Sequence, residues 1–395
     1  MRHISKGVRL AAALMALLLP ASFAVSAETA QAQRIYTVVS QGNSGQIFKE
    51  PQESTFWESP VLRAGEARED GILRFVNEDK AAVDVWIRAV ELPYDDEEAL
   101  AYLETAKMPI VLKADGLALG KGVLICNTLE EAKDGVRALM LDKQFGAAGS
   151  RIVVEEFMTG REVSVLSFVD GNTIKIMTSA QDHKRAKDGD QGLNTGGMGT
   201  FSPSPFYTDE VDAFCQKHIY QATVDAMKAE GREFKGIIFF GLMLTKNGPK
   251  VLEYNARFGD PETQVVLPLL ESDLLAVMQA ATNGTLAQTE VKFSGQSAAC
   301  VVLASGGYPQ HYEKGKPITG LADGQLPGGG ATVYHAGTAL ADNVLVTSGG
   351  RVLGVTAVAD SLFDAVAAAY GAADQIGFEG LHRRSDIGQK ALAAL

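Results

Sequence analysis

Two side chains with hard oxygen donors stand close together in VLEYNARFGDPETQ, residues 251–264. Glu253 and Asn255 are two residues apart, so in a strand both project from the same face. A carboxylate and an amide oxygen suit a Mg²⁺ ion that also takes triphosphate oxygens. Arg257 continues that face, and its planar fork suits a carboxylate or an acyl phosphate. The alternative, a hairpin edge with a surface salt bridge, does not explain the acidic run 260–262 after a glycine turn.

A second candidate site is the glycine-rich segment PIVLKADGLALGKGV, residues 109–123, which contains Lys113 and Lys121. Fixed cations and backbone N–H groups hold a triphosphate, and glycine lets the backbone approach it closely. Only three residues separate Gly116 from Gly120, and no Ser or Thr follows Lys121, so the segment is not a P-loop. A solvated surface loop with incidental lysines is the alternative.

A third segment, RIVVEEFMTGREVSV, covers residues 151–165 and predicts two strands joined by a turn at Gly160. The first strand ends at Glu155, Glu156 and Phe157, and Glu162 opens the second. Such a hinge suits a nucleotide, because its backbone groups can recognise the adenine edge and one carboxylate can bind ribose hydroxyls. An ordinary acidic hairpin is the alternative.

Residues 179–203 form a long polar, glycine-rich segment that we expect to be an irregular loop. Loops of this length in compact domains are usually functional or disordered. His183 has no His or Cys at metal-ligand spacing, so we assign it no metal role. Charged and ionisable residues run from Asp182 to Arg185, and Asn194, Thr195, Gly196 and Gly197 follow nearer the end of the segment.

Alternating helices and strands must position these residues. Thr128 followed three residues later by Glu131 predicts a capping box at a helix start, and Gly231 and Gly284 predict helix ends. The expected helices cover residues 95–106, 128–141, 209–230, 272–282 and 361–373. The expected strands cover residues 109–112, 151–156, 162–169, 173–178, 236–244, 250–254, 298–304, 332–335 and 351–358.

The N-terminal residues have a different texture. A basic start, an apolar run over residues 10–19 and small residues near Ala27 predict a signal peptide at residues 1–27, with a plain hydrophobic helix as the alternative. Residues 28–94 predict a β-like segment with no catalytic constellation: one strand and a polar turn lie in RIYTVVSQGNSGQIF (residues 34–48), and two more strands lie at 72–76 and 83–90. We expect one domain at 95–291 and another at 292–395, so the fold class is α+β.

Composition limits the function. The 395 residues carry a formal charge of −12, which argues against an extended nucleic-acid surface. Only the N-terminal apolar run approaches a membrane span in character, and it is too short for a stable one. Three widely spaced cysteines form no metal or disulfide pattern, so we expect reduced thiols at Cys126, Cys215 and Cys300.

From about Glu97 onward the chain resembles the phosphoribosylamine–glycine ligase (glycinamide ribonucleotide synthetase) family of the ATP-grasp superfamily. The motifs that carry the resemblance are IVLKADGLALGKGV, EEFMTGREVSV, SAQDHKR, NTGGMGTFSP, LEYNARFGDPETQ, SGGYP, HAGT and SGGRVLGVTA. The resemblance implies an ATP-grasp fold, with two α+β subdomains enclosing ATP, followed by a small C-terminal α+β domain. It also implies formation of glycyl phosphate from glycine and ATP, followed by attack of 5-phosphoribosylamine in purine biosynthesis.

The resemblance also implies roles for individual residues. Lys113 and Lys121 would contact the ATP phosphates, while Glu253 and Asn255 would bind Mg²⁺ (or Mn²⁺). Arg257 and Lys121 would act in catalysis. The adenine pocket and the ribose contact would come from Glu155, Glu156, Phe157 and Glu162. The substrate side would be formed by Asp182, Asn194, Thr195, Gly196, Arg257 and Asp260.

The chain departs from the family at its N-terminus. Family members begin with a glycine-rich domain that starts near GNGGREHA and holds the phosphoribosylamine, and this sequence has no counterpart. Two alternatives to the ligase therefore stand: an inactive Mg-ATP-binding relic, and an exported protein whose function lies in residues 28–94. The chemistry predicts a cytoplasmic monomer, whereas the signal peptide predicts export.

Overall fold

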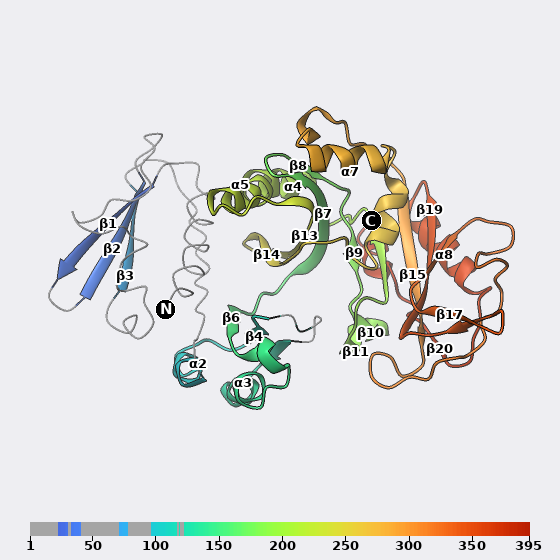
Figure 1. Cartoon of the computed structure of the whole chain (residues 1–395), viewed down its shortest axis with the longest axis horizontal. Helices are drawn as coiled ribbons and strands as arrows, with labels where there is room; N and C mark the ends of the chain where they lie inside the picture. Colours follow the sequence, from blue (N-terminus) through green and yellow to red (C-terminus); the bar gives the residue numbers. More distant parts are fainter. Residues whose placement is uncertain (1–22, 31–32, 41–70, 78–95, 117, 119–121) are drawn as a thin grey trace. The chain divides into compact units, whose positions relative to one another are not determined.

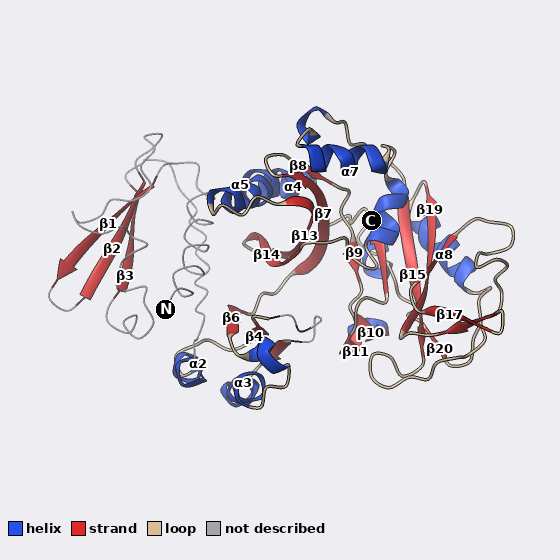
Figure 2. Cartoon of the chain, in the orientation of Figure 1, coloured by secondary structure: helices blue, strands red, loops and turns tan. Residues whose placement is uncertain are grey.

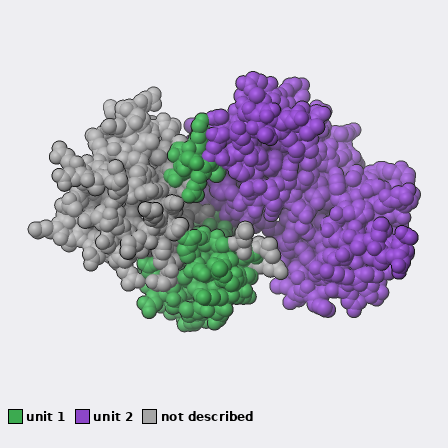
Figure 3. Space-filling model, in the orientation of Figure 1, with its two compact units in different colours: residues 1–158, 225–232 green, residues 159–224, 233–395 purple. Residues whose placement is uncertain are grey.

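The computed structural model describes residues 23–30, 33–40, 71–77, 96–116, 118 and 122–395. The chain divides into two compact units, coloured separately in Figure 3. Unit 1 contains Met1–Met158 and Asp225–Arg232, and unit 2 contains Thr159–Val224 and Glu233–Leu395.

Unit 1 contains a small antiparallel sheet with the strand order β5-β4-β6, of which β4 and β6 are labelled in Figure 1. Its apolar core joins the sheet to two helices through buried side chains such as Leu103, Leu112 and Ile152. The strands are β4 (Ile110–Ala114), β5 (Val123–Cys126) and β6 (Ile152–Glu156), and the helical segments are α2 (Asp96–Leu103), α3 (Leu129–Val136), η3 (Arg137–Leu141) and η4 (Gly146–Gly149).

The predicted capping box of α3 is half confirmed. The Thr128 hydroxyl accepts the Glu131 N–H at 3.2 Å, as the motif predicts. The Glu131 carboxylate, however, accepts the N–H of Asn127 at 2.7 Å instead of that of Thr128. Two donors and two acceptors at the helix start are therefore paired, with the reciprocal bond shifted one residue toward the N-terminus.

A second sheet of unit 1 lies at the N-terminus. β1 (Phe23–Ala30) pairs antiparallel with β2 (Gln33–Ser40), which pairs parallel with β3 (Gly71–Asn77). β3 matches the strand expected at residues 72–76, whereas the strand expected at 83–90 lies outside the described residues. β1 runs through Ala27, and the signal peptide stays a prediction.

Unit 2 begins with a four-stranded antiparallel sheet in the order β14-β13-β7-β8. Helical segments cover both of its faces (Figure 2). The strands are β7 (Arg161–Asp170), β8 (Ile174–Ile176), β13 (Lys235–Thr245) and β14 (Gly248–Asn255). One face packs on α4 (Asp209–Cys215) and η6 (Gln216–Tyr220), and the other on α6 (Thr263–Val266), η7 (Leu267–Leu269) and α7 (Leu274–Asn283).

The expected helix over residues 209–230 is present as α4, η6 and α5 (Gln221–Ala229), which follow one another without a break. Gly231 follows with φ +67°, a left-handed conformation that favours glycine. Gly284 likewise ends α7 with φ +75°. Both predicted stops are confirmed.

The second sheet of unit 2 has the order β16-β19-β15-β12-β9, and β20 also pairs with β15. Alternate residues of β15 serve two cores: Ala299 and Val301 face the core with α8, while Ala298 and Cys300 face the core with α6 and α7. The strands are β9 (Gln181–Asp182), β12 (Gly199–Ser202), β15 (Ser297–Ser305), β16 (Thr332–His335), β19 (Arg351–Ala359) and β20 (Leu381–His382). The remaining elements are β17 (Thr338–Ala341), β18 (Val344–Thr347), η8 (Leu286–Gln288), α8 (Leu362–Ala373) and α9 (Gln389–Leu392).

The expectation of an irregular loop over residues 179–203 is wrong. The segment contains β9 and β12 of the large sheet, together with the hairpin β10 (Arg185–Lys187) and β11 (Gln191–Asn194), joined by η5 (Asp188–Asp190). β12 pairs with residues about a hundred positions later in the chain: Gly199 lies opposite Val301. Local polarity could not reveal those partners. The sheet also crosses the expected domain boundary at residue 292.

Two further expectations concern thiols and membranes. Cys126, Cys215 and Cys300 are buried free thiols, as predicted. Within the described residues, no helix combines the length and apolarity needed to cross a bilayer.

Candidate functional site

One face of the four-stranded sheet brings several predicted site residues together. Glu253 pairs in register with Gly241 on β13, and Gly241 pairs with Ser164 on β7. Glu162 and Asn255 lie two residues away from Ser164 and Glu253 on their strands, and therefore on the same face. A Cβ atom at Gly241 would lie 3.0 Å from Glu253 Cγ, so the absence of a side chain there leaves room for the glutamate.

Lys184 lies between two carboxylates of this face. Its Nζ is 2.9 Å from Glu162 Oε2 and 4.0 Å from Glu253 Oε1. Burial lowers the pKa of Lys184, but the two carboxylates outweigh burial and raise that pKa above its ordinary value. A permanent cation thus connects the predicted ribose ligand to the predicted metal ligand. We did not single out Lys184 from the sequence; its place in SAQDHKR was the available signal.

Two carboxyl groups, Asp182 and Glu262, lie close to this lysine. Asp182 Oδ1 accepts the His183 N–H at 2.7 Å, and Glu262 Oε1 accepts the Ser164 hydroxyl at 3.0 Å. Burial raises the pKa of Asp182, and the charge of Glu262 raises it further. Burial likewise raises the pKa of Glu262. The pair therefore favours keeping a proton at pH values above those at which carboxyl groups ordinarily lose it. Only the acidic run 260–262 pointed to Glu262.

Gly197 packs between Asp182 and the turn after β14. It has φ +113°, and a Cβ atom there would lie 2.6 Å from Asp182 Oδ1 and 2.5 Å from Pro261 Cδ. Thr195 holds the Gly197 backbone in this position, because its hydroxyl donates to Lys184 O at 2.8 Å and accepts the Gly197 N–H at 3.0 Å. Two glycine-rich motifs far apart in sequence thus meet at Asp182.

The other residues expected on the substrate side are spread around these turns. Asn194 is exposed and lies opposite Arg185 in the β10–β11 hairpin. The exposed Arg257 donates from Nη1 to Phe258 O at 2.8 Å. Asp260 forms an ion pair with Arg351, whose Nη2 lies 2.9 Å from Asp260 Oδ2.

In unit 1, Lys113 and Glu155 form an ion pair with 2.7 Å between Nζ and Oε2. The lysine side chain is 22% exposed and the glutamate side chain 10%, so the pair is largely shielded from solvent. We had expected Lys113 at the phosphates and Glu155 at the adenine. Glu156 is the exposed last residue of β6 and the exposed Phe157 follows it, whereas Lys121 lies outside the described residues.

His183 is buried with both ring nitrogens occupied. Nδ1 lies 3.1 Å from Gly199 O, and Nε2 accepts the Gly388 N–H at 3.3 Å. Burial, together with the nearby Arg384 charge, lowers the pKa of His183 to about 4. The neutral ring is therefore a structural link with no lone pair left for a metal.

The donor set fits a metal held partly by a ligand. Among the described residues, no group of three His, Cys, Asp or Glu side chains could hold an ion alone. Glu253 and Asn255 supply two hard oxygens on one face, and a triphosphate would supply others.

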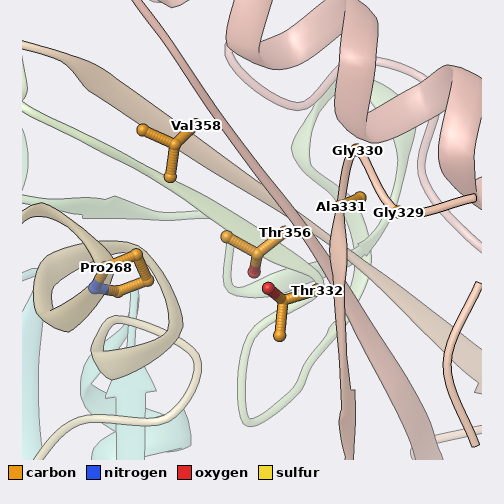
Figure 4. Close-up of a pocket in the computed structure, with 7 residues that line it drawn as sticks. All are labelled: Pro268, Gly329, Gly330, Ala331, Thr332, Thr356 and Val358. Carbon is orange, nitrogen blue, oxygen red and sulfur yellow. The ribbon is translucent and has the colours of Figure 1, made fainter.

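The structure also contains a pocket of about 410 Å³ away from these residues, between η7 and strands β16 and β19 (Figure 4). Thr332 lies opposite Thr356 across these strands. The lining contains no predicted site residue: Pro268, Gly329, Gly330, Ala331, Thr332, Thr356 and Val358.

Comparison with known proteins connects this geometry to a family. The model of the phosphoribosylglycinamide synthetase ATP-grasp (A) domain matches residues 80–263, and that of the C domain matches residues 298–390. The first match begins at residue 80, within the β-like segment 28–94 and before Glu97, where we expected the resemblance to start. Both sheets of unit 2 fall largely within the matched regions.

Individual relatives agree with the family models. The chain is 49% identical over 303 residues to the trifunctional purine biosynthetic protein adenosine-3 of Gallus gallus, covering 76% of this chain and 30% of that protein. It is 47% identical to the phosphoribosylamine–glycine ligase of Vibrio cholerae, covering 75% of this chain and 69% of the ligase. The chain thus spans less than a third of the trifunctional protein and about seven tenths of the ligase.

Solved structures confirm the fold. The crystal structure of phosphoribosylamine–glycine ligase from Thermotoga maritima superposes with a TM-score of 0.68 at 36% identity, covering 76% of this chain and 74% of that one. A Campylobacter jejuni biotin carboxylase shares the fold at 14% identity, with a TM-score of 0.56 over 75% of this chain and 64% of that one. The predicted ATP-grasp architecture is therefore confirmed, and the chain belongs to the phosphoribosylglycinamide synthetase (phosphoribosylamine–glycine ligase) family of ATP-dependent ligases.

Proposed function

We propose that this protein joins glycine to 5-phosphoribosylamine at the expense of ATP. The glycine carboxylate attacks the γ-phosphorus of ATP. The bond between that phosphorus and the oxygen bridging to the β-phosphate breaks, and ADP leaves with the electron pair. The amine of 5-phosphoribosylamine then attacks the carbonyl carbon of glycyl phosphate, and inorganic phosphate leaves as the amide forms. The amine loses a proton in this step, and the product is glycinamide ribonucleotide.

The observation that carries this proposal is the position of Lys184 between Glu162 and Glu253. The chain places a cation beside the carboxylates to which we assign ribose and metal binding, on one face of one sheet. Charge neutralisation and orientation supply most of the catalysis in phosphoryl transfer, so this arrangement matches the chemistry.

The nucleotide contacts follow from the same assignment. Lys113 and Lys121 neutralise the phosphates, Glu155, Glu156 and Phe157 line the adenine site, and Glu162 binds the ribose. The ion pair of Lys113 with Glu155 keeps the ammonium oriented before ATP arrives. Lys184 holds the Glu162 carboxylate in place through their ion pair.

Glu253 and Asn255 would hold the Mg²⁺ or Mn²⁺ ion. When bound, the ion neutralises charge on the triphosphate and on the phosphoryl group in transfer. The chain's own contribution is to fix two oxygens on one strand face and to place Lys184 beside one of them.

The glycine and the acceptor amine would bind around the Asp182–Glu262 pair, Gly196 and Asp260. Arg257 would orient the glycine carboxylate through guanidinium nitrogens other than Nη1 and stabilise the acyl phosphate. Asn194 and Thr195 would border the same site. The raised pKa of the buried carboxyl pair suits it to accept the proton released by the attacking amine.

ADP release from purified protein with Mg-ATP and glycine, with and without 5-phosphoribosylamine, tests the proposal. Release that depends on both substrates supports the ligase. Binding of Mg-ATP without release, in folded protein, supports the second candidate, an ATP-binding relic. The part of the relatives that this chain does not cover is the observation that favours that candidate.

Location and assembly are further parts of the proposal. ATP chemistry favours the cytoplasm, whereas the N-terminal sequence favours a signal peptide at residues 1–27. N-terminal sequencing of protein purified from its own cells distinguishes the two, because export by this route removes those residues. We also propose a monomer, which light scattering measures directly.

A further inference from the structure

Arg351 is held at the start of β19 with its side chain only 19% exposed. Its guanidinium makes three hydrogen bonds to two segments that precede the C-terminal family domain. Nη1 donates to Gly196 O at 2.7 Å and to Asp260 O at 3.0 Å, and Nη2 donates to Asp260 Oδ2 at 2.9 Å. One fork thus joins the NTGG turn to the FGDP turn.

Both backbone polar groups of Gly196 are hydrogen-bonded to side chains. Its N–H donates to the Tyr308 hydroxyl at 3.0 Å, while its carbonyl accepts from Arg351. A Cβ atom at Gly196 would lie 3.0 Å from Arg351 Cζ and Nη2, so the guanidinium packs against the bare backbone. Both polar groups of this residue are therefore paired with side chains of the C-terminal family domain.

The loops that carry Tyr308 and Arg351 pack against each other. A Cβ atom at Gly350 would lie 2.2 Å from Tyr308 Cδ2, so the tyrosine ring packs directly on the residue before Arg351. Ser305 ties the same two loops together: its N–H donates to Gly350 O at 2.8 Å and its hydroxyl to Gly349 O at 2.9 Å. Tyr308 and Arg351 therefore act from one rigid block.

We propose that Arg351 is a positioning residue for the glycine and acceptor side of the site, with Tyr308 as its partner. This inference rests on the proposed function, because it assigns Gly196 and Asp260 to substrate binding. The C-terminal family domain sets the spacing of these two turns without itself supplying a reacting group. An ammonium at this position cannot make the three bonds of the fork in one plane, so charge alone does not replace it.

The test compares Arg351→Lys and Tyr308→Phe with wild type and with Arg383→Ala. Arg383 is the matched control, because it also pairs with an aspartate, Asp374, but contacts neither turn. The KM for glycine and for ATP are measured by ADP release with all substrates present. Amide hydrogen exchange is measured at Gly196 and Gly197 in the same proteins without substrates.

We expect Arg351→Lys to raise the KM for glycine about 10- to 100-fold, while the KM for ATP stays within about twofold. Exchange at Gly196 and Gly197 should rise about 10-fold or more in both site variants and stay at the wild-type rate in Arg383→Ala. Wild-type exchange and wild-type KM values in Arg351→Lys would overturn the proposal, as would an equal rise of both KM values.

The exchange measurement separates this inference from the function on which it rests. If the wild-type protein releases no ADP, the proposed ligase activity fails, and the amide rates alone decide whether Arg351 fixes the turn. If ADP release is normal but Arg351→Lys leaves the amides protected, the ligase stands and the positioning role fails.

Discussion

His183 Nε2 accepts a hydrogen bond from the Gly388 backbone N–H, although 205 residues separate the two in the chain. The bond requires a lone pair on Nε2, so the ring proton resides on Nδ1, which faces Gly199 O. A second proton on the ring would abolish the bond to Gly388 and place a charge in a buried site beside Arg384.

We therefore predict that His183 stays neutral down to about pH 4, compared with an ordinary value of 6.5. The unfolded chain binds this proton more tightly than the folded protein does. The contribution of neutral His183 to the free energy of unfolding is therefore complete above pH 6.5 and is lost as the pH falls toward 4. The loss amounts to about 3 kcal/mol. NMR titration of the ring protons measures the midpoint directly. A midpoint near pH 6.5 in the folded protein would contradict the prediction.

Replacing Glu253 by Gln should lower ATP turnover about 100-fold or more, because the change removes a charged metal ligand and leaves Lys184 paired with Glu162 alone. ADP formation at saturating Mg-ATP measures the effect. Glu290→Gln is the matched control, since Glu290 forms an exposed pair with Lys292. Equal rates in the two variants would remove Glu253 from the site.

Replacing Gly197 by Ala should destabilise the protein more than replacing Gly231 by Ala. Both glycines have positive φ, which costs an alanine about 1–2 kcal/mol. A Cβ at Gly231 meets nothing within 4 Å, whereas one at Gly197 collides with Asp182 and Pro261 and adds roughly 1–3 kcal/mol. Thermal unfolding followed by circular dichroism compares the two variants. An equal drop in Tm for Gly197→Ala and Gly231→Ala would show that a Cβ atom fits at Gly197 without a collision.

Arg384→Met should cost about 3–5 kcal/mol of stability, because it removes the fully buried cation that Asp386 and Asp190 share and leaves Asp190 with Lys390 alone. Arg384 binds both carboxylate oxygens of Asp386 at 2.7 Å and Asp190 Oδ1 at 2.9 Å. Arg383→Met, which removes a more exposed guanidinium, should cost at most about 1 kcal/mol. Chemical denaturation measures both, and a small loss for Arg384→Met would mean that the network is solvated.

Local pattern was sufficient for much of the fold. The alternation of β14 correctly placed Glu253 and Asn255 on one face, since both fall within that strand. Thr208 caps α4 and Ser361 caps α8, so these helix starts were readable within a residue or two. Such features depend on neighbours a few positions apart.

The contacts that complete the site depend on distant partners. Lys184 meets Glu253, and Arg351 meets Gly196, only because separate strands pair within unit 2. The polar letters of residues 179–203 do not alternate, because β12 is buried on both faces whereas β11 is exposed on both. No periodicity within that segment predicts a strand, and none points to Arg351.

The link between His183 and the residues around Gly388 has a consequence for how this protein is made. A ribosome finishes the segment that carries Asp182 and Gly197 long before it reaches the glycine that anchors the segment. Until residues 297–305 emerge, β12 has no β15 to pair with, and β9 joins the sheet through β12. The segment of the nascent chain that contains β9 and β12 is therefore exposed to proteases and chaperones during synthesis. These two strands join their sheet late.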